Sequence, residues 1–365
     1  MNCKRGILLY DQLACMGGAE RLTLILLQEL KHAELCVGYV ESPDILTPYL
    51  SAIKIHQISY KSSIPGWHML HLYEDFKRKS GFIKNFDWVI FSGAAAPIAV
   101  HHHLSGNNYL YCHTIPRVAY DLKDFYLNKL SLWNRQILKA LIAYIRFHYE
   151  KAIDQMDIIA VNSKNTQQRL KQFTGHDSII IYPPCEIDRF QWINQNDYYL
   201  STARLEEFKR VDIIVKAFMR MPDKNLIVAS GGQQLETLRS MAKPYKNIHF
   251  TGWIPDQTLI ELIGKAIATI YIPIDEDFGM SPIESMAAGK PVIGVAEGGL
   301  LESIVHGETG LLINSPPSED DIINAVRTLT PNFAKTMRTA CENRAKQFSK
   351  DMFIQKIKSA FHIGN

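Results

Sequence analysis

The sequence has few of the features that mark membrane-spanning, secreted or nucleic-acid-binding proteins. No apolar run approaches the roughly 18 residues that a membrane-spanning helix needs. The N-terminal apolar run over 7–10 ends at Asp11 and is too short for the apolar region of a signal peptide. The net charge is only +3, so bulk electrostatics require no nucleic-acid partner. These absences lead us to expect a cytoplasmic protein that binds no nucleic acid.

Cysteine and metal-ligand patterns are equally sparse. His101, His102 and His103 are consecutive, so their side chains point in different directions, and no carboxylate is spaced to complete a metal site with them. The sequence therefore predicts no metal and no other cofactor. The cysteines form no Cys-x-x-Cys pair, which favours a reducing compartment over a zinc cage or a disulfide framework; they lie at 3, 15, 36, 112, 185 and 341.

Short apolar runs alternate with helical patterns along the whole chain. At 365 residues the chain is long for one hydrophobic core and suits two domains. Asn162-Ser163 is predicted to cap a helix over 164–173, and 183–188 is predicted to be the linker between the domains. In the first half, dense apolar runs predict buried parallel strands over 6–10, 35–40, 88–92, 109–112, 158–161 and 179–182.

The second half restarts the same alternation. Strands are predicted over 198–203, 225–230, 249–251, 268–272, 292–295 and 310–313. Helices are predicted over 210–219, 235–241, 257–265 and 350–361. Two βα-repeating halves favour an α/β protein with two doubly wound domains, residues 1–185 and 186–348, followed by a terminal helical segment over 349–365.

The stretch 273–291 is the most informative part of the chain. Glu276 and Glu284 are separated by a turn, 278–281, and by Pro282, which suits the first turn of a helix. Glu284 is predicted to lie in that first turn, where its negative charge suits the helix dipole. The backbone amides of Gly279, Met280 and Ser281 are predicted to point at a bound phosphate. Carboxylates beside a phosphate site suit a ligand rich in hydroxyls, such as a sugar nucleotide.

This stretch resembles the E-x7-E signature of the retaining glycosyltransferases of family 4, which have the GT-B fold. The resemblance continues through 296–302 and 306–312, with Leu301 where the family usually has proline. It implies two Rossmann-like domains that face each other across a cleft, an N-terminal one for the acceptor and a C-terminal one for the nucleotide sugar. It also implies that the terminal helix crosses back onto the first domain.

The residues 201–212 follow a predicted strand and open a predicted helix. Arg204 and Lys209 can both reach one diphosphate from this loop, because Arg offers a planar fork and Lys a compact charge. The resemblance implies that these two residues neutralise the leaving nucleoside diphosphate. Arg210 follows Lys209 directly, so the identity of the second cation stays ambiguous by one position.

The resemblance also implies the other donor contacts. Glu276 would bind hydroxyls of the donor sugar, and Glu284 would bind the ribose. The turn that begins at Phe278 would bind phosphate. Trp253 lies in a segment, 250–255, that resembles the family's turn beside the nucleobase, although an ordinary core or rim tryptophan is the alternative.

In the first domain, Gly17 and Gly18 resemble the family's glycine loop, which permits close approach of the backbone to donor or acceptor. This loop is predicted to open a helix that runs to about Lys31. The segment 111–117 is similar to the His-Thr-Pro-x-Arg pattern of O-antigen-type mannosyltransferases, with Ile115 inserted. His113 would then bind a sugar hydroxyl at the reacting centre, and a purely structural histidine is the alternative.

Two segments of the first domain combine apolar and basic residues. The segment 129–150 is predicted to be an amphipathic helix with a basic stripe of Arg135, Lys139 and Arg146. The segment 67–84 places basic residues 77–79 among apolar ones. Either these helices pack on a core with a solvated edge, or they make peripheral contact with an anionic membrane surface.

Together these features predict a retaining hexosyltransferase with a glycan or lipid-linked sugar as the acceptor. The pattern around His113 favours mannose from GDP-mannose as the donor. A UDP-sugar-dependent transferase and a non-catalytic GT-B scaffold subunit are the alternatives.

Overall fold

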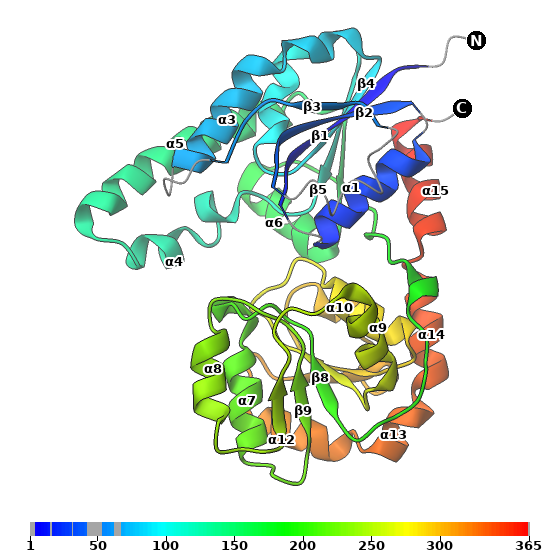
Figure 1. Cartoon of the computed structure of the whole chain (residues 1–365). Coiled ribbons are helices and arrows are strands. Elements are labelled where there is room, and N and C mark those ends of the chain that lie inside the picture. Colours follow the sequence, from blue (N-terminus) through cyan, green and yellow to red (C-terminus); the bar gives the residue numbers. More distant parts are fainter. Residues whose placement is uncertain (1–3, 15–16, 31, 42–52, 62–66, 364–365) are drawn as a thin grey trace. The chain divides into compact units, whose positions relative to one another are not determined.

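The computed structural model describes residues 4–14, 17–30, 32–41, 53–61 and 67–363. The chain divides into two compact units, each with one parallel β-sheet and helices packed around it (Figure 1). Unit 1 comprises 1–182 together with 354–365, and unit 2 comprises 183–353. The division lies between Tyr182 and Pro183, at the start of the predicted linker. The last helix, α15 (Lys350–Phe361), has the predicted bounds and continues from unit 2 into unit 1.

Within the described residues, the sheet of unit 1 has seven parallel strands in the order β3-β2-β1-β4-β5-β6-β7. The strands β4 and β6 have their predicted bounds, whereas β7 ends before the predicted Tyr182. The edge strand β3 was absent from the prediction because its sequence, Ile-His-Gln, forms no apolar run. The bounds are β1 (Gly6–Leu13), β2 (Ala33–Val40), β3 (Ile55–Gln57), β4 (Trp88–Ser92), β5 (Asn107–Cys112), β6 (Ile158–Val161) and β7 (Ile179–Ile180).

The helices of unit 1 follow the predicted patterns with shifted ends. Ser163 caps α6, because its hydroxyl accepts the N–H of Thr166 at 2.9 Å, as predicted. The long helix α5 begins at Leu132 instead of Lys129, because a separate short helix, α4, precedes it. The predicted helix end at Lys31 lies outside the described residues. The bounds are α1 (Gly18–Glu29), α3 (Trp67–Lys79), η1 (Gly81–Asn85), η2 (Ala96–His102), η3 (Arg117–Ala119), α4 (Lys123–Asn128), α5 (Leu132–Ile153) and α6 (Lys164–Thr174), where η marks a 3-10 helix.

Unit 2 lies wholly within the described ranges, and its sheet has six parallel strands in the order β10-β9-β8-β11-β12-β13. The strands are β8 (Tyr199–Ser201), β9 (Leu226–Val228), β10 (Ile248–Phe250), β11 (Thr269–Tyr271), β12 (Val292–Val295) and β13 (Gly310–Ile313). The helices are η4 (Ile187–Arg189), η5 (Glu207–Lys209), α7 (Val211–Met219), α8 (Leu235–Ala242), α9 (Asp256–Lys265), α10 (Met280–Ala287), α11 (Leu300–Ser303), α12 (Glu319–Thr328), α13 (Pro331–Thr336) and α14 (Arg338–Lys346).

The predicted alternation of strands and helices is correct in both units. The apolar runs became central strands that are buried on both faces, as helix-covered parallel sheets require. Four of the cysteines, at 36, 112, 185 and 341, are buried and form no disulfide, while Cys3 and Cys15 lie outside the described residues. Burial raises the pKa of the Cys36 and Cys341 thiols to about 12, so both stay protonated and unreactive.

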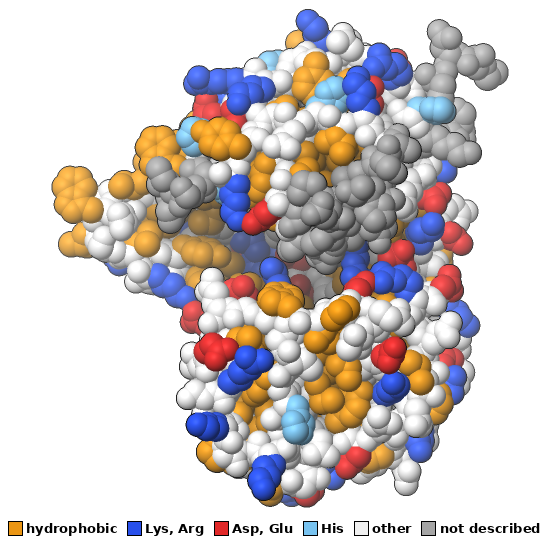
Figure 2. All heavy atoms as spheres, in the orientation of Figure 1, with side chains coloured by type: hydrophobic (Ala, Val, Ile, Leu, Met, Phe, Trp, Pro, Cys, Tyr) orange, Lys and Arg blue, Asp and Glu red, His pale blue; other side chains and the backbone are white. Residues whose placement is uncertain are grey.

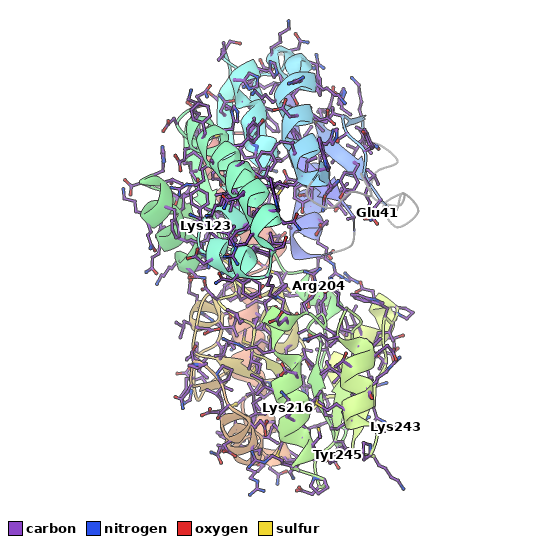
Figure 3. All side chains as sticks on the ribbon, turned by 90° about the vertical axis from the view of Figure 1, so that its left-hand side faces the viewer. Glu41, Lys123, Arg204, Lys216, Lys243 and Tyr245 are labelled. Carbon is purple, nitrogen blue, oxygen red and sulfur yellow. The ribbon has the colours of Figure 1, made fainter. Side chains whose placement is uncertain are left out.

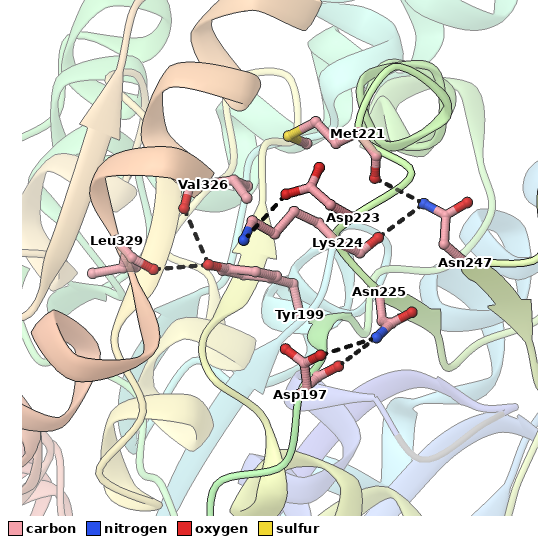
Figure 4. Close-up of polar contacts among 9 residues, drawn as sticks. All are labelled: Asp197, Tyr199, Met221, Asp223, Lys224, Asn225, Asn247, Val326 and Leu329. Carbon is pink, nitrogen blue, oxygen red and sulfur yellow. Dashed lines mark hydrogen bonds and ion pairs between the residues drawn. The ribbon is translucent and has the colours of Figure 1, made fainter.

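A buried tyrosine ties the sheet of unit 2 to the end of a helix that is distant in sequence (Figure 4). The hydroxyl of Tyr199, on β8, donates to the carbonyl oxygens of Leu329 at 2.8 Å and Val326 at 3.1 Å, at the end of α12. On the other side of the same sheet end, the Asn247 amide donates to the carbonyls of Met221 and Lys224. These side chains satisfy backbone carbonyls that helix and turn geometry leaves without partners.

We expect Tyr199→Phe to destabilise unit 2 by about 1–3 kcal/mol, because two buried carbonyls lose their shared donor. The change should be measured by denaturant unfolding followed by circular dichroism. Tyr245→Phe is the matched control, since among the described residues the Tyr245 hydroxyl has no hydrogen-bond partner. An equal loss in both variants would contradict the role of the Tyr199 hydroxyl.

The stability difference between wild type and Tyr199→Phe should also depend on pH. Burial, followed by the charges of Asp197 and Asp223, raises the pKa of Tyr199 to about 12 in the folded state, against about 10 in an unfolded chain. The stability that the protonated phenol contributes is therefore fully present below about pH 10 and is lost as the pH rises towards 12. The stability gap between wild type and Tyr199→Phe should shrink over this range.

Candidate active site

In unit 2 the strand order reverses between β8 and β11, which pair through Leu200 and Thr269. Open parallel sheets bind ligands beyond the carboxyl ends of their strands at such a switch point. The segment after β8 carries Arg204 and Lys209, and the loop after β11 carries Glu276. The topology therefore brings the predicted cations and the predicted carboxylate to one edge of the sheet.

Lys209 and Glu276 form an ion pair at this edge. The Nζ atom of Lys209 lies 2.5 Å from Oε2 of Glu276 and donates to the hydroxyl of Tyr271 at 3.1 Å. Lys209 and Tyr271, the last residue of β11, are both buried. Burial, followed by the charge of Glu276, raises the pKa of Tyr271 well above its usual value, so its hydroxyl remains protonated at neutral pH. Sequence reasoning missed Tyr271, since an aromatic residue ending a strand looks like ordinary core.

Arg210, the neighbour of Lys209, binds a different carboxylate. It lies at the N-cap of α7 in a left-handed conformation, with φ of 53°. Its guanidinium lies 2.7 Å from Oε1 of Glu297, and the same oxygen accepts the N–H of Asp275 at 3.0 Å. Of the two adjacent cations, Lys209 is thus the one that reaches Glu276, while Arg210 ties the segment after β8 to the loops after β11 and β12.

Two glycines after β12 allow this loop to pack against the loop after β11. The N–H of Gly299 donates to the carbonyl oxygen of Glu276 at 2.8 Å. A Cβ atom on Gly298 would lie 2.5 Å from that oxygen, and one on Gly299 would lie 2.4 Å from Cα of Phe278. The Gly-Gly pair is therefore required for the close contact that orients the backbone of Glu276.

The helix α10 begins at Met280, directly after Gly279, whose φ of 87° lets the chain turn into the helix. Pro282 lies in the first turn, but the prediction that Glu284 also lies there is wrong: Glu284 is the fifth helical residue and lies in the second turn. In this helix, whose residues are all described, no side chain caps the N-terminus. The amides of Met280 and Ser281 have no intrahelical acceptor, as at any helix start.

Phe278 has a structural role. Its side chain is buried, and its ring packs edge-on against Phe348 with centroids 5.3 Å apart. Only its backbone can therefore contact a ligand at the turn.

Arg204 and Trp253 are exposed at the same edge of unit 2. Figure 3 shows Arg204 at one end of the unit and Lys216 towards the other. Trp253 follows β10 and is 71% exposed. Its indole lies over the loop after β9, because a Cβ atom on Gly231 would be 2.4 Å from the indole nitrogen. An exposed indole at the carboxyl edge of the sheet suits stacking on a planar base.

In unit 1 the strand order reverses between β1 and β4. Gly17 is the N-cap of α1 and Gly18 its first residue, so the predicted glycine loop lies after the carboxyl end of β1; Met16 of the same loop lies outside the described residues. A Cβ atom on Gly17 would lie 2.7 Å from a carboxylate oxygen of Glu20. A side chain at position 17 would therefore collide with the Glu20 carboxylate.

His113 follows β5 at the same edge of unit 1. Its Nε2 atom lies 2.8 Å from the hydroxyl of Ser92, at the end of β4, and its carbonyl oxygen accepts the side-chain amide of Asn162 at 2.8 Å. Desolvation lowers the pKa of His113 to about 4, so the imidazole is neutral at physiological pH. A neutral, oriented imidazole can exchange hydrogen bonds with a hydroxyl group.

Asp11 is a further residue that sequence reasoning passed over, because it simply ended an apolar run. Its carboxylate accepts backbone N–H groups from Ala94, Ala95 and Ala96, with shortest distances of 2.7, 3.0 and 2.8 Å. Burial raises the pKa of Asp11, while these three amide hydrogen bonds counteract the shift. No sequence signal could have paired Asp11 with these residues.

The histidine run binds protein groups. The ring of buried His103 contacts Oδ1 of Asn108 at 2.7 Å and the carbonyl oxygen of Phe86 at 2.9 Å. His101 and His102 each contact a backbone carbonyl. Over the described ranges, no group of three or more His, Cys, Asp or Glu side chains is arranged to hold a metal ion.

Comparison with known proteins adds independent findings. Residues 186–348 match the family model of the glycosyl transferases group 1. The chain is 25% identical over 285 residues to the human alpha-1,3/1,6-mannosyltransferase ALG2. The aligned region covers 68% of this chain and 65% of that protein. It is 30% identical over 234 residues to a D-inositol 3-phosphate glycosyltransferase of Corynebacterium aurimucosum, covering 55% of each. The match therefore spans less than two thirds of each relative's length.

A solved structure, Anabaena Alr3699/HepE in complex with UDP and glucose, shares the fold. It superimposes with a TM-score of 0.75 at 16% identity, covering 98% of this chain and 99% of that chain. The two parallel sheets with their switch points are those of the GT-B fold, as predicted. Residues 186–348 therefore match a glycosyltransferase family model, and the chain as a whole has the GT-B fold and is similar to mannosyltransferases.

Proposed function

We propose that this protein is a retaining hexosyltransferase that transfers mannose from GDP-mannose to a glycan or lipid-linked sugar. The observation that carries the proposal is the Lys209–Glu276 pair beside the start of α10, at the switch point of the group 1 glycosyltransferase domain. Cations and helix-start amides suit a diphosphate, and a carboxylate suits sugar hydroxyls.

We assign the donor contacts by combining this geometry with the roles that the family resemblance implies. Arg204 is exposed and able to approach a diphosphate, whereas Lys209 is buried and already neutralised by Glu276. An arriving diphosphate would share Lys209 with Glu276, and Glu276 would gain hydrogen bonds from the sugar. The amides of Gly279, Met280 and Ser281 would bind phosphate oxygens, Glu284 the ribose and Trp253 the base. Binding of phosphate and of sugar would thereby be coupled through one ion pair.

The proposed chemistry needs no separate base. The bond from the sugar C1 to the diphosphate oxygen breaks, and a bond from C1 to the acceptor oxygen forms on the same face. The acceptor proton passes to the departing diphosphate. Arg204, Lys209 and the α10 amides would stabilise the charge that develops on that leaving group. His113, held by Ser92 through Nε2, would offer Nδ1 to a sugar hydroxyl.

The donor sugar is the finer part of the proposal. The pattern around His113 and the likeness to alpha-1,3/1,6-mannosyltransferases support mannose. The structural relative in complex with UDP and glucose supports a UDP-sugar as the alternative donor. The presence of Arg204, Lys209, Glu276 and Glu284 speaks against the other alternative, a non-catalytic GT-B scaffold subunit.

The first experiment is a panel of nucleotide sugars, with binding followed by thermal shift and transfer followed by release of nucleoside diphosphate. We expect GDP-mannose to give the largest shift, and we expect turnover to survive EDTA because protein cations and amides neutralise the leaving group. Preference for a UDP-sugar would replace the donor assignment. Loss of turnover in EDTA that a divalent metal restores would contradict the metal-free proposal.

The second experiment tests the two cations. Arg204→Ala and Lys209→Ala should each cut turnover roughly 100- to 1000-fold and weaken nucleoside diphosphate binding, because charge on the leaving group loses a partner. Lys216→Ala is the matched control, since Lys216 also pairs with a carboxylate, Asp212, but lies away from this edge (Figure 3). Near wild-type transfer by both Arg204→Ala and Lys209→Ala would exclude their assigned role.

We also propose that the protein works on the cytoplasmic face of a membrane, with unit 1 in peripheral contact. Leu132, Trp133 and Ile137 of α5 are 75%, 81% and 65% exposed. Figure 2 shows hydrophobic side chains gathered on the projecting end of unit 1 that α4 and α5 form. Exposed apolar residues beside exposed Lys139 suit an anionic lipid surface. No described helix has both the length and the apolarity to cross a bilayer.

Several residues of the two predicted membrane-contact segments are buried or already paired within the protein. In the second half of α5, Ile145 is buried, and Arg146 pairs with Glu150. Arg135 donates to the carbonyl oxygen of Leu127. The second candidate segment is mostly structural: in α3, Leu72, Tyr73 and Phe76 are buried, while Arg78 and Lys79 pair with acidic residues one turn earlier.

The third experiment is sedimentation with vesicles. Binding should appear with anionic lipid, fade on neutral lipid and weaken as salt rises, because the Debye length falls to about 3 Å at 1 M salt. Leu132→Ser with Trp133→Ser should abolish binding, and replacing Arg135, Lys139 and Arg146 by Gln should weaken it at low salt. Phe147→Ser, an exposed apolar residue further along α5, is the control. Absence of any dependence on anionic lipid would contradict membrane contact.

A further inference from the structure

The turn after β4 is held by a carboxylate from the neighbouring strand β1. Asp11 follows Tyr10, which pairs with Ser92 in the parallel register, so Asp11 lies beside the start of this turn. Its two oxygens accept the N–H groups of residues 94–96, at the start of η2. Three converging amides form an anion-binding arrangement, and in this protein an internal carboxylate occupies it.

Gly93 makes this contact sterically possible. Its φ is 117°, a conformation that side chains rarely adopt, and a Cβ atom there would lie 2.4 Å from Oδ1 of Asp11. The carboxylate and the turn are therefore packed together with no space for a side chain between them. A displacement of the carboxylate must move the turn, and Ser92 precedes the turn directly.

Ser92 transmits the position of the turn to His113. Its hydroxyl lies 2.8 Å from Nε2 of His113. The ring of His113 is also flanked edge-on by Tyr10 and Tyr111, with centroid distances of 6.3 and 5.1 Å. The strands β1, β4 and β5 thus each contribute a contact that orients this imidazole.

We propose that Asp11 is a positioning residue for His113, acting through the turn over 93–96 and the hydroxyl of Ser92. The proposal rests on the proposed function in one respect, namely that His113 contacts the reacting sugar. A carboxylate is required at position 11 because each of its two oxygens accepts more than one N–H. An amide or a hydroxyl carries an N–H or O–H donor of its own, which would face the N–H donors of the turn.

The test is Asp11→Asn, which keeps the shape but turns N–H donors towards the turn amides. We expect turnover to fall about 100-fold, as for a displacement of about 1 Å at a reacting centre, while nucleoside diphosphate affinity, assigned to unit 2, stays unchanged. Ser92→Ala removes the hydroxyl that contacts His113 but leaves the hydrogen bonds between Asp11 and the turn intact. It should reproduce the loss of turnover. Asp157→Asn is the matched control, because Asp157 also accepts a backbone N–H, from Asn108 at 2.7 Å, at the start of β6.

A double-mutant cycle separates positioning from general stabilisation. In a His113→Ala background, Asp11→Asn should cause no further loss of turnover; a further loss as large as in wild type would overturn the proposal. A second readout needs no activity: the imidazole ¹⁵N and ¹H resonances of His113 should shift in Asp11→Asn and Ser92→Ala but not in Asp157→Asn. Unchanged resonances would overturn the proposal even if the transferase assignment held, and shifted ones would support it even if that assignment failed.

Discussion

Two adjacent cations, Lys209 and Arg210, hold the loops of unit 2 together, and the geometry of the candidate site depends on them. Lys209 binds Glu276 after β11, and Arg210 binds Glu297 after β12. Both pairs are largely buried, so removing one partner would leave an uncompensated charge in a poorly solvated position, at a cost of about 3–5 kcal/mol. The loops are therefore organised before any ligand arrives, and the cost of ordering them is met during folding.

The same ion pair also constrains binding. Because Glu276 already neutralises Lys209, a diphosphate gains less from Lys209 than it would from an unpaired cation. Exposed Arg204 pairs with no carboxylate in the part of the chain that the structure describes, so this restriction does not apply to it. The proposed donor would thus contact Lys209, which Glu276 already holds in place, and Arg204, whose exposed side chain can move. Through its pair with Glu276, Lys209 would link the phosphate end of the ligand to the sugar end.

The two units have the same type of sheet, but the amides of the turn after β4 and those at the start of α10 have different partners. In unit 1 the amides of the turn after β4 bind the internal carboxylate of Asp11. In unit 2 no side chain caps the start of α10, and all residues of that helix are described. An anionic ligand can therefore bind at the helix-start amides of α10, whereas the amides of the turn after β4 in unit 1 are already satisfied by Asp11.

The sequence by itself determined the order of strands and helices, the two doubly wound units and the presence of the signature, because apolar periodicity and glycine or proline turns are local properties. The strands β4, β6, β12 and β13 have their predicted bounds. Only the tertiary structure decided which side chains meet. Asp11 binds amides 83 to 85 positions away, and Lys209 binds a carboxylate 67 positions away. Such partners are set by strand order and loop packing, which no local pattern encodes.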